Sequence, residues 1–152
     1  MSENTTRQFI SFTIGDEEYG VNIMAIREIK GWTQTTELPN TPPYMRGVIN
    51  LRGAIIPILD LRARFTNQLT QTSARHVIIV ISVEDKVAGL LVDAVADIIT
   101  VPNDDIQALP HQERGQDGGF LTGLVTVENR MVALLDLKQV YDFEQFGPND
   151  QI

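Results

Sequence analysis

The stretch GVINLRGAIIPILDLRARF, residues 47–65, decides the fold. Two apolar segments rich in β-prone residues flank a single Arg-Gly dipeptide, a pattern typical of two strands joined by a tight turn. Glycine at position 53 tolerates the positive φ angle that such a turn requires. The stretch therefore predicts a β-hairpin with Arg52 at its tip, and it raises the question of what an arginine does there.

The composition narrows the class of protein. The chain has 152 residues, of which 43% are hydrophobic, and this length favours one domain or two very small ones. The net charge of -8 argues against nucleic-acid binding, which depends on a basic surface. Because the chain has no cysteine, disulfides, thiol catalysis and thiolate metal sites are excluded.

Charge is distributed unevenly along the chain. Residues 27–75 carry seven Arg or Lys against three acids, whereas residues 76–152 carry four against thirteen. This polarity fits either complementary protein contacts, including self-association, or a solvated surface without a partner. No apolar run reaches the roughly 18 residues that cross a bilayer, and the N-terminal segment MSENTTRQ lacks the pattern of a signal peptide. We therefore expect a cytoplasmic protein.

The sequence repeats itself. The segment YGVNIMAIREI (19–29) aligns with AGLLVDAVADI (88–98) at a shift of 69 residues, and residues 47–65 align with GLVTVENRMVALLDLKQVY (123–141) at a shift of 76. The two shifts differ by seven, which predicts an insertion within the polar, glycine-rich segment 111–119. Two alignments in the same order indicate an internal duplication.

The duplication predicts a mainly all-β fold of two related half-domains, at about residues 8–70 and 71–143. Each half would hold about five short strands, as in a small barrel or sandwich, with exchange of strands between the halves left open. Halves of roughly seventy residues are marginal alone, so we expect them to share a core. We also expect one helical turn within each of NIMAIREI and DAVADII, short helices starting after Asp60 and Asp136, and flexible tails at 1–7 and 146–152.

The two copies also bear on Arg52. Gly53 aligns with Asn129, and both residue types tolerate positive φ, so the turn geometry is kept in both copies. Arg52, however, aligns with Glu128, which shows that the turn itself does not require an arginine. Arg52 is then either a solvent-facing residue or one that reaches an acid, a carbonyl or a partner, and Glu28 is the nearest acidic candidate.

The segments FTIGDEEYGVNIMAIREIKG, NTPPYMRGVINLRGAIIPILDLR, VAGLLVDAVADI and FLTGLVTVENRMVALLDL resemble the CheW family of chemotaxis coupling proteins over residues 8–143. The resemblance implies two tandem five-stranded, SH3-like β-barrels around a shared hydrophobic core. It also implies a non-enzymatic adaptor that couples chemoreceptor tips to the histidine kinase CheA, whose regulatory domain has the same fold. CheW-like coupling proteins of twitching-motility or surface-sensing pathways are the nearest alternative.

The resemblance also assigns partner-binding residues. Arg52 and Glu28 match a pair that either bind each other or compete for groups of a partner. The apolar groove for the receptor tip matches Ile26, Val77, Ile78, Val95 and Ile98, with the backbone shaped by Gly47, Gly89 and Gly123. The non-functional interpretation stays open for each: an Ile or Val there can be core, and a Gly can serve a bend. The loop 107–112 lacks the Arg or aromatic residue that can mediate ring assembly in this family.

Other classes of function find little support. His76 and His111 lie far apart, and the sequence contains no hydrolase, zinc-protease or P-loop motif, so no catalytic site is expected. The acids at 84, 85, 104 and 105 form no calcium-binding loop, and neither a metal nor a cofactor is expected. An SH3-like binder of proline-rich peptides, using Trp32, Tyr44 and Tyr19, is a further alternative.

Overall fold

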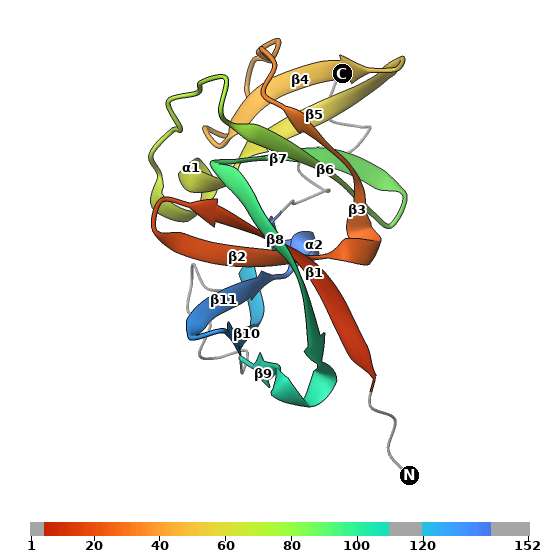
Figure 1. Cartoon of the computed structure of the whole chain (residues 1–152). Helices are drawn as coiled ribbons and strands as arrows, with labels where there is room; N and C mark the ends of the chain where they lie inside the picture. The colour runs from red at the N-terminus through yellow and green to blue at the C-terminus, as the bar shows by residue number, and fades with distance from the viewer. Residues whose placement is uncertain (1–4, 110–119, 141–152) are drawn as a thin grey trace.

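The computed structural model describes residues 5–109 and 120–140, which form two β-sheets and a few short helical segments (Figure 1). The strands are β1 (Thr6–Ile14), β2 (Glu17–Asn22), β3 (Ile26–Gly31), β4 (Met45–Leu51), β5 (Ala54–Asp60), β6 (Val77–Val83), β7 (Lys86–Val92), β8 (Ala94–Pro102), β9 (Gln107–Ala108), β10 (Leu121–Val127) and β11 (Arg130–Leu135). The helical segments are η1 (Ile23–Ala25), α1 (Leu61–Thr66), η2 (Asn103–Asp105) and α2 (Leu137–Val140). The all-β class predicted from the sequence is confirmed.

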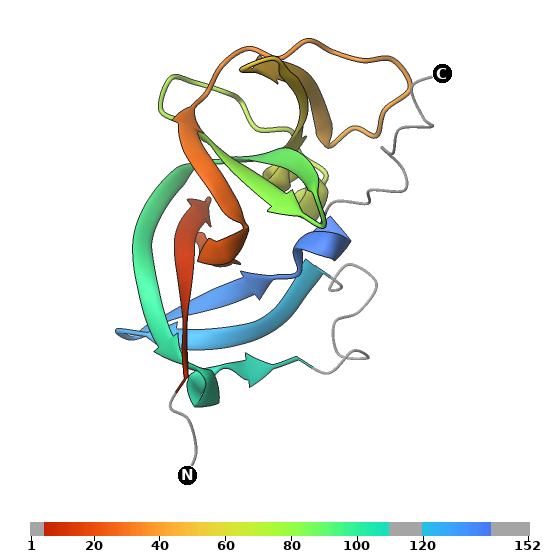
Figure 2. The ribbon, with the colours of Figure 1, turned by 90° about the vertical axis from the view of Figure 1, so that its right-hand side faces the viewer.

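Both sheets combine strands from the two halves of the sequence. The first sheet has the order β8-β1-β2-β11-β10-β9, and the second has the order β3-β6-β7-β5-β4. Figure 1 shows the red β1 and β2 next to the teal β8 and the blue β11, and Figure 2 shows the same mixing from the side. Neither half therefore closes a barrel from its own strands, because each contributes strands to both sheets.

The exchange is symmetric with respect to the internal repeat. β5 pairs in parallel with β7, where Ile58 lies opposite Gly89, and β11 pairs in parallel with β2, where Leu134 lies opposite Gly20. These two pairs are equivalent under the 69- and 76-residue shifts. A Cβ atom on Gly89 would lie 2.6 Å from Ile58 Cδ1, so the absence of a side chain leaves room for the neighbouring strand.

Three clusters of buried side chains hold the fold together. One lies in each barrel, and the third contains residues of both sheets, which confirms the shared core. Neighbouring residues on one strand point into different clusters: Ile58 lies in the core of the second sheet, whereas Leu59 lies in the shared cluster. Leu134 and Leu135 divide in the same way. This arrangement explains why β5 and β11 are apolar on both faces.

The ends of two elements differ from the sequence-based expectation. β1 starts at Thr6, not at residue 8, because Thr6 and Arg7 pair with Pro102 and Val101 of β8. A helical turn, η1, precedes β3 as expected, but the predicted turn in DAVADII is wrong. β8 begins directly at Ala94, since its backbone pairs with β1 from that residue onward. The predicted insertion at 111–119 and the tail at 146–152 lie outside the described residues.

The two short helices start where the sequence predicts. The side chain of Asp60 accepts a hydrogen bond from the backbone N–H of Ala63 at 3.2 Å and caps α1. α2 follows Asp136, whose backbone carbonyl accepts hydrogen bonds from the N–H groups of Gln139 and Val140. Both copies thus place a short helix directly after an aspartate, but within the described residues Asp60 caps its helix with its side chain and Asp136 does not.

Candidate functional site

The turn between β4 and β5 presents Arg52. Arg52 has a φ of 52° and Gly53 a φ of 89°, and the N–H of Gly53 donates to Asn50 Oδ1 at 2.9 Å. In the other copy Glu128 and Asn129 have φ angles of 51° and 66°. Two consecutive positive φ angles are typical of the tight hairpin turn that matches the twist of its strands, so the predicted turn geometry is confirmed in both copies.

Arg52 forms an ion pair with Glu28 of β3, in which Arg52 Nη2 donates to Glu28 Oε1. The side chain of Arg52 is 72% exposed and that of Glu28 is 27% exposed. An ion pair in this setting contributes about 1 kcal/mol or less to folding. Arg52 could therefore exchange Glu28 for an acid of a partner at little cost to the fold.

Exposed aliphatic side chains occur close in sequence to both members of this ion pair. Ile29 of β3 is 41% exposed and Ile55 of β5 is 62% exposed. Ile29 points to the face of β3 opposite that of Glu28. We call Glu28, Arg52 and Ile55 the hairpin-tip surface. Arginine is one of the residues that protein interfaces favour over the rest of the surface.

The internal repeat produces an equivalent surface on the other barrel. The 69- and 76-residue shifts relate Glu28 to Asp97, Ile29 to Ile98, Arg52 to Glu128 and Ile55 to Met131. Ile98 and Met131 are also exposed, at 54% and 58%. We call the residues Asp97, Glu128 and Arg130, which ion pairs join, the acidic counterpart surface.

Arg130 organises the charges on the acidic counterpart surface. Its Nε donates to Glu18 Oε1 at 2.8 Å, while Nη1 and Nη2 lie 3.3 Å from Glu128 Oε1 and 3.8 Å from Asp97 Oδ2. The hydrogen bond with Glu18 raises the pKa of Arg130. Three carboxylates thus surround one guanidinium, so this surface is acidic where the hairpin-tip surface offers an accessible arginine.

The apolar groove residues predicted from the sequence occupy three kinds of environment. Ile26, Val77 and Val95 are half-buried and pack against the shared core cluster. Ile26 and Val95 are equivalent under the repeat and lie at the starts of β3 and β8. Ile78 is fully buried in the core of the second sheet, whereas Ile98 is exposed on β8. Ile98 is therefore the most exposed of these five residues.

The three predicted glycines lie where another chain segment comes close. A Cβ atom on Gly89 would lie 2.8 Å from Ile78 Cγ2, which brings these two predicted residues together. Gly47 has a φ of 138°, and a Cβ atom there would lie 2.3 Å from the carbonyl oxygen of Thr36. Gly123 is its equivalent, with Gln107 O at 2.9 Å from such an atom. The close approaches show that these glycines have a packing role.

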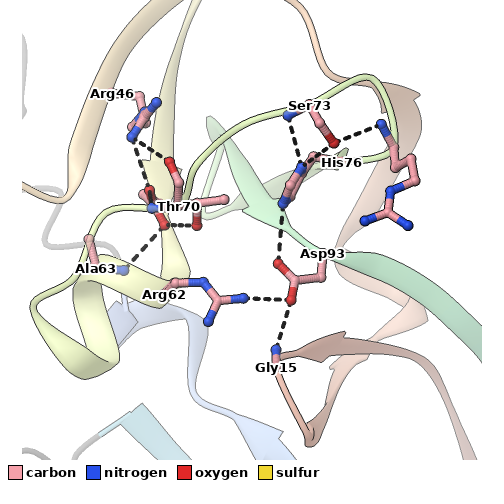
Figure 3. A network of polar contacts seen from close by, with 10 residues as sticks. Gly15, Arg46, Arg62, Ala63, Thr70, Ser73, His76 and Asp93 are labelled. Carbon is pink, nitrogen blue, oxygen red and sulfur yellow. Dashed lines mark hydrogen bonds and ion pairs between the residues drawn. The ribbon is translucent and has the colours of Figure 1, made fainter.

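A polar cluster centred on Asp93 joins the two sheets (Figure 3). Asp93 Oδ2 accepts hydrogen bonds from Gly15 N at 2.7 Å and from Arg62 Nη2 at 2.6 Å, and Oδ1 lies 3.4 Å from His76 Nε2. Burial favours a higher pKa for Asp93, but the hydrogen bonds from Gly15 and Arg62 and the charge of Arg62 outweigh it and lower the pKa. Gly15 belongs to the β1–β2 turn and Arg62 to α1, so one carboxylate connects both barrels.

Within residues 5–109 and 120–140, no helix is both long and apolar enough to cross a membrane. The same part of the chain contains no group of three or more His, Cys, Asp or Glu side chains arranged to hold a metal ion.

Residues 8–145 match the CheW-like domain family. The chain belongs to this family. Chemotaxis protein CheW of Rhizobium meliloti (strain 1021) is 47% identical over 142 residues, which cover 93% of this chain and 92% of the relative. The crystal structure of the scaffolding protein TtCheW from Thermoanaerobacter tengcongensis has a TM-score of 0.83 and 29% identity, covering 91% and 94% of the two chains. A more distant relative, Protein FrzA of Myxococcus xanthus, is 30% identical over 104 residues, or 68% of this chain and 65% of its own.

CheW proteins are scaffolds and adaptors of chemotaxis, and the β-rich fold of this chain matches that family. Several surface residues were nevertheless missed in the sequence. Ile29, Ile55 and Met131 could have been found by comparing the two copies, because each exposed aliphatic residue has an exposed aliphatic equivalent. The comparison of the two copies could not have found the Asp93 cluster, because this cluster joins residues 15, 62, 76 and 93, which are distant in sequence.

Proposed function

We propose that the protein couples the cytoplasmic tips of chemoreceptors to a CheA-type histidine kinase and so places kinase autophosphorylation under receptor control. The observation that carries the proposal is the exposed Arg52–Glu28 ion pair at the tip of the β4–β5 hairpin, with the exposed Ile55 three residues further along the same hairpin. It supplies a charged, partly apolar surface that can bind a partner without disturbing the fold.

The hairpin-tip surface is the proposed kinase contact. The regulatory domain of CheA shares the two-barrel fold of the family, so it can present a surface resembling the acidic counterpart surface of this chain. Arg52 would then exchange Glu28 for a carboxylate of the kinase, while Ile55 becomes covered. Complementary charges at such a contact favour rapid association and fix its register.

The receptor contact is proposed on the other side of the shared core, around Ile98. This side chain is 54% exposed, and the half-buried Ile26, Val77 and Val95 lie against the same core cluster. An amphipathic helical tip could place its apolar face on such side chains, with the charges of Asp97 at the rim. The glycines at 47, 89 and 123 support this role indirectly by allowing the strands to pack closely.

The adaptor acts by contact alone in this proposal, without catalysis or a cofactor. Receptor control requires that the receptor bind the adaptor–kinase unit differently in the kinase-on and kinase-off states, since a ligand shifts an equilibrium only through differential affinity. The protein would work in the cytoplasm and be recruited to receptor arrays at the membrane through the receptor tips.

Self-association is a secondary part of the proposal. The hairpin-tip surface and the acidic counterpart surface hold equivalent positions in the internal repeat, carry different charges and lie on different barrels of one chain. A contact between the first surface of one copy and the second surface of another is heterologous, and it generates closed rings where the rotation closes. Each hairpin-tip surface would then bind either another copy or the kinase, because both contacts use Arg52.

Two variants separate the proposed contacts. Binding of the kinase regulatory domain and of a receptor signalling domain is measured by calorimetry for Arg52→Ala, Ile98→Ser and the control Lys86→Ala. Arg52→Ala should weaken kinase binding about tenfold and leave receptor binding unchanged, and Ile98→Ser should do the reverse. If each variant affects both partners equally, or neither, the assignment of two distinct surfaces is wrong.

The pathway is proposed to be chemotaxis because the relative from Rhizobium meliloti and the matched scaffold structure are both CheW proteins. A twitching-motility or surface-sensing pathway would use the same adaptor surfaces with a different kinase. Binding to such a kinase, with no affinity for a chemotaxis CheA, would move the protein to that pathway.

A further inference from the structure

We propose that two pockets on either side of Leu69 form one docking groove for an acidic linear segment of a partner protein that carries a bulky apolar side chain. This groove is separate from the surfaces proposed above. None of Glu28, Arg52, Ile98 or Met131 lines either pocket. The inference therefore stands independently of the proposed coupling function.

The first pocket is cationic. It has a volume of about 560 Å³, and Arg62, Arg75 and His76 line it together with a single acid, Asp93. Figure 3 shows Arg62 and His76 pointing toward Asp93 from two different elements. Asp93 engages Arg62 and His76, so a further acid must find another donor in this pocket.

Arg75 supplies the charge that remains available. Asp93 is occupied by Arg62 and His76, and within residues 5–109 and 120–140 the guanidinium of Arg75 forms no ion pair. The backbone N–H of Arg75 donates to Ser73 Oγ at 3.2 Å, which holds the main chain near the pocket and leaves the side chain unused. An arginine presents five N–H donors in a fork that fits a carboxylate.

The second pocket combines apolar and polar side chains. It has a volume of about 510 Å³, and Trp32, Leu38, Pro42 and Leu69 line it together with Glu37 and Arg46. The guanidinium of Arg46 lies 5.9 Å from the centre of the Trp32 ring, within the range of a cation–π contact. Single exposed aliphatic residues are common, but here Leu38 and Leu69, exposed at 42% and 55%, line the same pocket.

Leu69 joins the two pockets because it lines both of them. An extended peptide advances about 3.3 Å per residue, so a few residues suffice to place an acid beside Arg75 and an apolar side chain against Trp32. The charge of the chain supports an acidic occupant. Residues 27–75, which include Arg62 and Arg75, carry a net charge of +4 in a protein whose total is -8.

Fluorescence anisotropy with a labelled synthetic peptide tests the groove. The probe is a short run of glutamates around one phenylalanine, and two control probes replace the phenylalanine with serine or the glutamates with glutamines. The full chain is compared with Arg75→Ala and Leu69→Ser, and the matched control variants are Lys86→Ala and Met24→Ser, whose side chains lie outside both pockets. We expect Arg75→Ala and Leu69→Ser each to weaken binding of the acidic phenylalanine probe roughly tenfold.

The control variants should bind like the wild type, and both control probes should bind at least tenfold more weakly than the parent. The proposal is overturned if the probe does not bind at millimolar concentration, if the serine-containing probe binds equally well, or if Arg75→Ala and Leu69→Ser bind like the wild type. Sedimentation equilibrium tests whether a second copy of this chain occupies the groove. Self-association that Leu69→Ser abolishes would contradict the assignment to a partner protein.

Discussion

Replacing Asp60 by alanine removes a carboxylate that the fold relies on at three places. The side chain is fully buried between β5 and α1. Oδ2 accepts from the N–H of Thr70 at 2.8 Å, and Oδ1 accepts from the hydroxyl of Thr70 at 2.7 Å and from the N–H of Ala63 at 3.2 Å. Arg46 Nη1 lies 3.4 Å from Oδ2 (Figure 3).

The expected loss of stability follows from these contacts. Removal of the helix cap costs about 1 kcal/mol, and each buried donor of Thr70 left without an acceptor costs about 1–3 kcal/mol. Arg46, whose side chain is 20% exposed, also loses its acidic partner. Breaking a buried pair of this kind costs about 3–5 kcal/mol in total, and we expect Asp60→Ala to fall in that range.

Urea unfolding followed by circular dichroism measures the change in the free energy of unfolding. Asp136→Ala is the matched control, because Asp136 holds the equivalent position in the other copy. In the described part of the chain its side chain forms no hydrogen bond, so its removal should cost about 1 kcal/mol or less. Equal losses for the two variants, or a loss below 1 kcal/mol for Asp60→Ala, would refute the reasoning.

Three further predictions follow from single residues. Asp93→Asn should lower stability at neutral pH. Because the folded-state pKa of Asp93 is lowered, its contribution is present above the ordinary value of 3.8 and lost as pH falls through the folded pKa, so the wild type and the variant should converge in acid-titrated unfolding curves; a gap that persists at low pH contradicts this. Gly47→Ala should destabilise by about 2–4 kcal/mol in urea, because its Cβ would meet Thr36 O, whereas Gly31→Ala, with no atom within 4 Å of the new Cβ, should change stability by less than about 0.5 kcal/mol; similar values for the two would count against the close contact. Gly53→Val should lower the free energy of unfolding by about 1–2 kcal/mol, as followed by thermal unfolding. The cause is the φ of 89° alone, since the new Cβ would meet open space. An unchanged midpoint would show that the turn relaxes without strain.

Local features of the structure could be predicted because short stretches of sequence determine them. Gly53 and Asn129 lie in the tight turns that their backbone preferences favour. Asp60 caps a helix that begins at the next residue. The repeat also predicts equivalent strands, and β4 and β10 span equivalent residues at the 76-residue shift. Each of these features depends on a residue and its close neighbours.

The exchange of strands could not be predicted in the same way. β5 could meet either β2 or β7, because Gly20 and Gly89 offer the same small residue at equivalent positions. A parallel pair depends on the path of the chain between the strands, which the alternation of apolar residues does not determine. The structure selects β7 for β5 and β2 for β11. This selection gives the two barrels a shared core instead of two separate ones.

Part of the candidate site could be predicted from the sequence, and part could not. Glu28 was the nearest acidic candidate for Arg52 in the sequence, pairing of the two was one option that the family resemblance implied, and the structure places them in an ion pair. Ile78, by contrast, is fully buried in the core of the second sheet. The sequence alone does not show whether an apolar residue of a strand lies in the core or on the surface. The Asp93 cluster combines side chains from both barrels, so it exists only after the strands have exchanged.

The most direct test of the proposed coupling is kinase autophosphorylation in a reconstituted mixture of receptor signalling domain and CheA. The wild type should stimulate autophosphorylation strongly. Arg52→Ala should lose that stimulation and keep an unchanged unfolding midpoint, since the turn depends on Gly53 and the ion pair is largely exposed. Stimulation by Arg52→Ala equal to that of the wild type would contradict the account, because the exposed arginine would then have no part in kinase control.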